Sequence, residues 1–154
     1  MEKILDTTRQ NRKILYKILS GTPKAQLLKI PENFNNNLWW NIAHVVVTQQ
    51  LLVYKFSGLP MHVADNLVDK YKKGTKPEGS PSDEDIETVK KLLFSAIEKT
   101  EASYKAGEFK TYTAYTTSAN VTLNNVEDAM TFNVFHEGLH LGAILALLKA
   151  TASN

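Results

Sequence analysis

Four segments of this chain carry apolar side chains at the spacing of an amphipathic helix, and this spacing limits the possible folds more than any other feature. The segments cover approximately residues 1–20, 38–57, 83–104 and 125–150. Apolar residues that recur every three or four positions form one stripe along a helix, and the stripe must be buried against another element. Four such helices predict an all-α fold, a four-helix bundle with inward-facing stripes.

Capping and helix-breaking residues mark the ends of the predicted helices. Polar N-caps and acidic residues in a first turn favour helix starts, while Gly and Pro favour helix ends. The signals are Gly21-Thr22-Pro23, one of Asn35, Asn36 and Asn37, then Gly58-Leu59-Pro60, Ser82, Ala106-Gly107 and Asn125. About twenty residues between the second and third helices form a connection long enough to be functional or to cross the bundle. Residues 109–123 fit either an extended loop or a short hairpin.

Composition excludes several classes of protein. With 154 residues the chain is expected to form a single domain over residues 1–154, and the absence of cysteine excludes disulfides, thiolate nucleophiles and cysteine metal ligands. A net charge of +2 gives no basis for nucleic-acid binding. We expect no apolar run to reach the roughly 18 residues of a membrane span, and the first residues lack a signal-peptide core. We therefore expect no membrane contact and a cytoplasmic location.

The last predicted helix carries His136 and His140 in the pattern H-E-x-x-H. Residues four apart lie one above the other on a helix, so the two imidazoles can bind one ion. In zinc peptidases this pattern needs a third ligand downstream, but residues 141–154 contain no Asp, Glu or His. His44, on the second and mostly apolar helix, is then the candidate third ligand. Three histidines leave coordination positions open, as catalytic metals require; the alternative is a set of ordinary core histidines.

Other polar residues are candidates for the same site. Glu137 lies about 100° around the helix from His136, where it either orients a ligand, acts as a catalytic base, or is a surface or dimer-face carboxylate. Asn41 and Asn133 each precede a histidine by one turn or nearly so, and Asn11 interrupts the apolar stripe of the first helix. These asparagines are candidates for the second shell of ligands. For Asn11, solvent exposure of the middle of the stripe is an equally good explanation.

The long connection contributes two further features. His62 is expected to be solvated rather than part of the site. Residues 70–76 form the densest basic run, Lys-Tyr-Lys-Lys-Gly-Thr-Lys. A solvated loop is the simpler interpretation of this run, and recognition of an anionic group on a cofactor is the alternative.

The histidines stand in a pattern that resembles a known family. Trp39 and His44 on the second helix, followed by the run His136-Glu-x-x-His140-x-Gly-x-Ile on the last, are similar to the DinB-like family of proposed metal-dependent enzymes. Asn11 also resembles a recurrent asparagine of the family's first helix. The family usually has Gln after the glycine of the last helix, where this chain has Ala143.

The resemblance implies a four-helix bundle of up-down-down-up topology that often forms a homodimer. It also implies a divalent metal, zinc or nickel most commonly, held by His44, His136 and His140. Some relatives are thiol S-transferases or isomerases that use a low-molecular-weight thiol.

Three functions are compatible with these features. The first is a metal-dependent enzyme, a thiol S-transferase or a hydrolase, acting on an unknown small-molecule substrate. The second is a non-catalytic, stress-associated bundle with a structural metal. The third is a peptidase, which the missing downstream ligand disfavours.

Overall fold

Four long helices make up most of the computed structural model, which describes residues 1–152. They are α1 (Glu2–Gly21), α3 (Leu38–Gln50), α5 (Asp83–Lys105) and α6 (Val126–Thr151). The connections contain the short helices α2 (Lys24–Leu28) and α4 (Asp65–Tyr71), the π-helical turn η1 (Leu51–Lys55), and the short strands β1 (Tyr115–Thr116) and β2 (Thr122–Leu123). The predicted all-α fold is confirmed.

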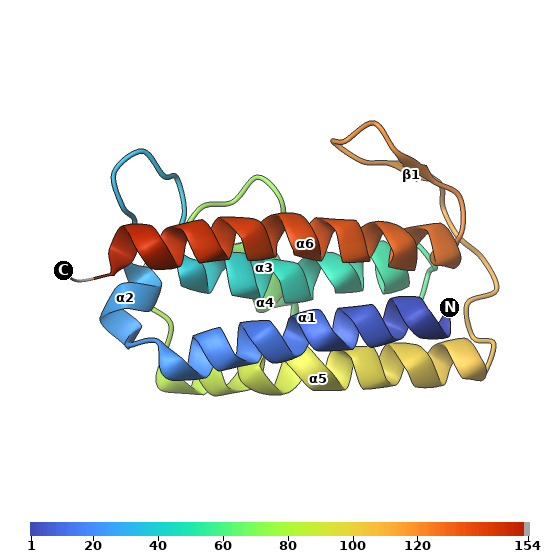
Figure 1. Cartoon of the computed structure of the whole chain (residues 1–154). Helices are drawn as coiled ribbons and strands as arrows, with labels where there is room; N and C mark the ends of the chain where they lie inside the picture. Colours follow the sequence, from blue (N-terminus) through green and yellow to red (C-terminus); the bar gives the residue numbers. More distant parts are fainter. Residues whose placement is uncertain (153–154) are drawn as a thin grey trace.

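Each long helix contacts two or more of the others along its length. Helix α6 packs against α1 and α3, while α5 packs against the opposite sides of the same two helices. In Figure 1, α1 and α6 run from right to left, whereas α3 and α5 run from left to right. The neighbours α3 and α6 therefore lie antiparallel, and side chains from their middle turns face one another.

The predicted helix starts are confirmed by their capping hydrogen bonds. Asn37 is the N-cap of α3, and its Oδ1 accepts from the Trp40 amide at 2.8 Å. Ser82 and Asp85 form a reciprocal capping box at α5, and Asn125 Oδ1 accepts from the Asp128 amide at 2.7 Å. Each cap satisfies a backbone N–H that lacks a partner within its own helix.

Helix α3 is the most deeply buried element of the bundle. All of its residues are buried except Thr48, which is half-buried. A helix that is apolar on every side is stable only inside a core, and this burial outweighs the strand propensity of the Val45–Val47 run. The helix continues as the π-helical turn η1. Such turns are often found at functional sites, because the extra residue changes the direction of the side chains.

The connection between η1 and α5 is held against α3 by two tryptophans. Trp39 Nε1 donates to the Tyr71 hydroxyl at 2.7 Å, and Trp40 Nε1 donates to Thr75 Oγ1 at 3.1 Å. The connection includes helix α4, which the sequence pattern did not predict. It is therefore an ordered part of the bundle wall beside His44.

Residues 109–123, which fitted two interpretations, form a small hairpin. Tyr115 pairs with Leu123 and Thr116 with Thr122 in an antiparallel register. The hairpin is attached beside η1, because the Thr113 amide donates to the Phe56 carbonyl at 2.7 Å and the Tyr112 hydroxyl donates to the Leu52 carbonyl at 3.0 Å. Figure 1 shows it projecting from the bundle beside α6.

Helix α6 differs from expectation in one respect. Within residues 1–152 it is the one helix long and apolar enough to pass a membrane-span test of length and hydropathy. Mostly buried core helices of soluble proteins pass the same test, whereas 22% of the apolar window of α6 is buried. Helix α6 packs against α1 and α3 and carries the buried, charged Glu137.

Candidate metal centre

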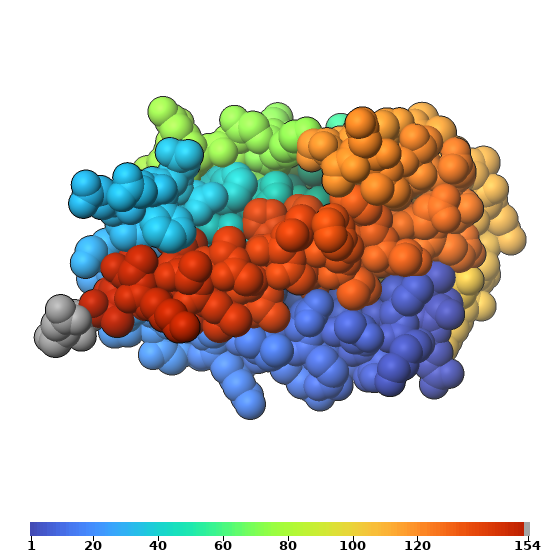
Figure 2. Space-filling view, turned by 45° about the horizontal axis from the view of Figure 1, so that its top comes forward, coloured from blue at the N-terminus to red at the C-terminus, as the bar shows by residue number. Residues whose placement is uncertain are grey.

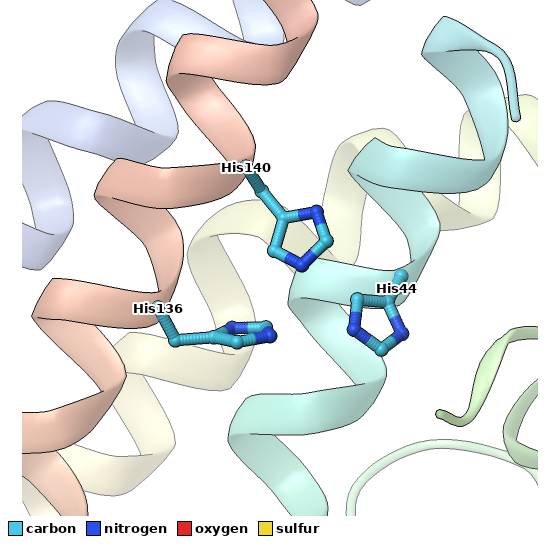
Figure 3. Close-up of side chains that lie close together, drawn as sticks. All are labelled: His44, His136 and His140. Atoms are coloured by element: carbon cyan, nitrogen blue, oxygen red, sulfur yellow. The ribbon is translucent and has the colours of Figure 1, made fainter. Parts of the chain in front are cut away.

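Three histidines from two helices meet between α3 and α6. His44 comes from α3, and His136 and His140 come from successive turns of α6 (Figure 3). Each imidazole offers one ring nitrogen to the group, and these nitrogens all lie within 4.8 Å of one another. The arrangement arises because the i, i+4 pair forms one face of α6 and the antiparallel packing places that face opposite the middle of α3.

Hydrogen bonds determine which nitrogen of His44 faces the group. Its Nδ1 lies 2.6 Å from the Tyr71 carbonyl oxygen, which can only accept, so Nδ1 carries the proton and Nε2 keeps its lone pair. Thr48 Oγ1 lies 3.2 Å from this Nε2. A backbone carbonyl that fixes the tautomer of a histidine in this way is a common second-shell feature of metal sites.

Asn41 has the same role for His140. Its Oδ1 lies 2.8 Å from His140 Nδ1, while its Nδ2 donates to Asn36 Oδ1 at 3.0 Å and to the Asn37 carbonyl at 2.8 Å. Because the amide nitrogen is committed to these acceptors, the oxygen must face His140 and accept from Nδ1–H. The lone pair of His140 is therefore on Nε2. The structure thus brings the predicted second-shell residue Asn41 into contact with a cluster histidine.

His136 is the least satisfied of the three histidines. Its Nδ1 is buried and has no hydrogen-bond partner among the described residues. Burial lowers the pKa of His136 to about 3, with smaller contributions from His140, His44 and Arg12. Burial, with a smaller contribution from His44, lowers the pKa of His140 to about 4, and burial also lowers the pKa of His44. All three imidazoles are therefore neutral at pH 7, the form that binds metals.

The donor set fits a divalent metal. Neutral imidazole suits zinc, nickel, copper and iron. In a tetrahedral zinc site with Zn–N bonds of 2.0–2.1 Å, two nitrogens lie about 3.4 Å apart. With all ligand atoms within 4.8 Å, the widest pair needs to approach by at most about 1.4 Å to reach this separation.

A cavity of about 410 Å³ opens beside the histidines. Its walls come from α3, η1, α6, the hairpin and Lys73 after α4. Figure 2 shows the surface hollowed between α6, the hairpin and the segment that follows η1. The apolar lining includes Phe132 and Phe135, and no carboxylate lines this cavity. A small molecule in it can therefore reach the three histidines.

Glu137 does not lie in this cavity. Glu137 follows His136 directly, so it lies about 100° further around α6 and its side chain is directed towards α1. There the side chains of both Glu137 and Arg12 are 0% exposed. Arg12 Nη2 and Nε donate to Glu137 Oε1 at 2.7 and 3.0 Å, and Asn133 Nδ2 donates to the same oxygen at 2.8 Å. The structure therefore places Glu137 and Asn133 in an ion-pair network behind His136, away from the open face of the histidines.

Two further candidates also lie outside the cluster. Asn11 is half-buried on α1, and its side chain makes no hydrogen bond to a histidine within the described residues. His62 packs edge-on against Tyr54 with ring centroids 4.8 Å apart, and its backbone amide donates to Gln50 Oε1 at 2.7 Å. His62 is therefore half-buried rather than fully solvated.

Sequence analysis missed Arg12 and the Tyr71 carbonyl. The signal for Arg12 was present: it lies in the stripe of Leu5, Thr8, Leu15 and Leu19, and Glu137 is the one acidic residue of α6 beyond its first turn. A charge in each of two apolar stripes predicts a buried pair. A backbone carbonyl carries no residue-specific signal, so the contact of Tyr71 with His44 depends on where α4 packs.

Comparison with known proteins identifies the family of this chain. The search of curated proteins finds no match. The sequence profile of the DinB superfamily matches residues 7–144, a range that includes all three histidines, Asn41 and the Arg12–Glu137 pair. The match covers far more than half of the chain, and the chain belongs to the DinB superfamily.

Proposed function

We propose that this protein is a divalent-metal-dependent enzyme whose metal is held by His44, His136 and His140. One observation carries the proposal: the ligand nitrogens of the three histidines lie within 4.8 Å of one another at the wall of an open cavity. A structural metal site is normally closed by four protein ligands, whereas a catalytic site keeps a position free. No fourth His, Cys, Asp or Glu belongs to the group within residues 1–152.

The protein residues around this site have distinct roles in the proposal. The Tyr71 carbonyl and Asn41 hold His44 and His140 with Nε2 directed into the group. Thr48 lines the cavity next to His44 and offers a hydroxyl to a bound substrate. A bound divalent metal supplies Lewis acidity, which lowers the pKa of a water or thiol and polarises a substrate oxygen. Zinc and nickel are the metals we propose.

The reaction that we propose is transfer to or from a low-molecular-weight thiol, or hydrolysis of a small molecule. The thiol comes from the resemblance to relatives of known activity, and the cavity is of the size that takes a small molecule. A peptidase is less compatible with the structure, because the Glu of H-E-x-x-H must act as a base at the metal, and Glu137 is engaged by Arg12. We also propose a cytoplasmic homodimer.

Elemental analysis of untagged protein tests the metal site. Wild type is compared with His44→Ala and with His62→Ala, a matched control that removes the histidine outside the cluster. We expect near-stoichiometric zinc or nickel in wild type and in His62→Ala, and loss of the metal in His44→Ala. Wild-type protein that holds no metal after incubation with zinc and with nickel would remove the basis of the proposal.

The second candidate function is a non-catalytic metal-binding bundle. It is favoured by the position of His44 and His136 on two different helices, which a metal would link. If the metal is structural, its binding energy appears as folding stability, so chelation should lower the melting temperature strongly. An enzyme instead predicts turnover on a panel of thiol-acceptor or ester substrates, with activity lost in His44→Ala and kept in His62→Ala.

A further inference from the structure

The cavity beside the histidines has a charge distribution that the proposed function leaves unused. Its lining combines apolar side chains with two lysines, Lys55 and Lys73, and contains no Asp or Glu. Lys55 is the last residue of η1, and Lys73 belongs to the basic run that follows α4. A cavity with cationic groups and no carboxylate favours an anionic occupant, and low-dielectric walls strengthen this preference.

Lys55 and Lys73, unlike four other lysines of the chain, have no carboxylate partner within residues 1–152. Lys24, Lys72, Lys90 and Lys105 each form an ion pair with a carboxylate. Lys55 and Lys73 are both exposed. Asp65 and Asp69 line an adjoining hollow together with the same two lysines, but Asp69 is already paired with Lys72.

The remaining walls are suited to an apolar body. Phe132 and Phe135 pack against each other with ring centroids 5.6 Å apart, and Phe56 stacks on Tyr115 at 4.5 Å. Phe135 is 51% exposed and Leu139 is 57% exposed, although both line the cavity. A ligand that covers apolar side chains at a cavity mouth removes apolar surface from water, and this favours binding.

We propose that this cavity binds a small organic anion, with its apolar body against the aromatic side chains and its carboxylate, sulfonate or phosphate group at Lys55 and Lys73. The inference rests on the proposed function only for the reacting end of the ligand, which lies at the histidines. Binding of the anionic group at the two lysines does not require a metal. The two parts can therefore be tested separately.

A pair of fluorescent probes with the same aromatic body tests the inference. The anionic probe is 8-anilinonaphthalene-1-sulfonate, and the neutral probe is N-phenyl-1-naphthylamine. Both are titrated into wild type, into the double variant Lys55→Gln/Lys73→Gln, and into Lys90→Gln/Lys105→Gln. The last variant is the control, because it removes the same charge from two positions on α5 that do not line the cavity. Circular dichroism and thermal melting verify that each variant is folded.

We expect the sulfonate probe to bind wild type and the control alike, and to bind Lys55→Gln/Lys73→Gln about tenfold more weakly. The neutral probe should bind all three proteins within about twofold. Added salt should weaken sulfonate binding to wild type more than to the double variant, because salt screens exposed charges. Leu139→Gln should weaken both probes, because it makes the cavity mouth polar.

Three results would overturn the inference: no sulfonate binding to wild type, equal sulfonate binding to wild type and the double variant, or equal weakening of both probes in a folded double variant. The titrations are repeated on chelated and on metal-loaded protein. Lysine-dependent sulfonate binding by a protein that holds no metal would refute the proposed function and support this inference. Metal binding together with sulfonate binding that does not depend on the lysines would support the proposed function and refute this inference.

Discussion

The buried pair of Arg12 and Glu137 allows a quantitative prediction. Arg12 donates to Glu137 on α6 and, through Nη2 at 3.4 Å, to the Val45 carbonyl on α3. Glu137 is the neighbour of His136, and Val45 is the neighbour of His44. One side chain of α1 therefore links the two helices that carry the histidines, at the positions next to them.

Replacing Arg12 by Met should destabilise the protein strongly. The substitution leaves the Glu137 carboxylate, which is 0% exposed, with Asn133 as its remaining hydrogen-bond donor among the described residues. Breaking a buried ion pair by removing one partner typically costs about 3–5 kcal/mol, a large part of the roughly 5–15 kcal/mol that stabilises a small domain. Loss of the link between α3 and α6 should also weaken zinc binding about tenfold, within the range typical of residues that support metal ligands.

Urea unfolding followed by circular dichroism measures the free energy of unfolding for chelated protein, and zinc titration measures affinity. The control is Arg9→Met, since Arg9 pairs with Glu101 where both side chains are about one-third exposed, and this loss should cost at most about 1 kcal/mol. The double variant Arg12→Met/Glu137→Met should recover most of the stability, because an apolar pair removes the uncompensated charge. The reasoning is refuted if Arg12→Met costs no more than Arg9→Met, or if the double variant is no more stable than Arg12→Met.

Three further predictions concern α3 and α6. Asn41→Ala removes the acceptor for His140 Nδ1–H and should weaken zinc affinity about 10- to 100-fold by calorimetric titration; unchanged affinity would show that Asn41 does not orient His140. The pKa values of His136 and His140 are lowered by burial to about 3 and about 4, below the roughly 6.5 of an unfolded histidine, so below pH 6.5 the unfolded chain takes up protons that the folded metal-free protein does not. The free energy of unfolding of chelated protein should therefore fall by up to about 1.4 kcal/mol per pH unit for each histidine as the pH drops from 6.5 to 5, and a flat profile in urea titrations would contradict this. Gly142→Ala should stabilise the protein by about 0.5–1 kcal/mol, because a Cβ there meets no atom within 4 Å and Ala favours the helix; a lower melting temperature would mean that Gly142 makes a contact outside this chain.

Local patterns predicted the elements of this fold well, for physical reasons. The caps at Asn125 and Ser82 were readable because a side chain within three residues satisfies the exposed amide. The i, i+4 spacing of His136 and His140 defines one face of any helix, so the pair required no knowledge of packing. The lack of a downstream ligand and the apolar second helix then made His44 the candidate partner, and the resemblance to the DinB superfamily implied the same three residues. The profile match over residues 7–144 confirms the membership of that superfamily.

Other features depend on how the helices are rotated and packed. The close approach of His44 to the pair on α6, the direction of Glu137 towards α1, and the contact of the Tyr71 carbonyl with His44 all join residues far apart in the sequence. Apolar periodicity gives the buried face of a helix only approximately, so it did not show that Arg12 rather than Asn11 enters the core. The sequence alone therefore determined the helices and the histidine pair, because both follow from contacts within a few residues. The packing of α1, α3 and α6 determined that the predicted third histidine meets this pair, and it determined the buried ion pair, because long-range contacts exist only once the bundle closes.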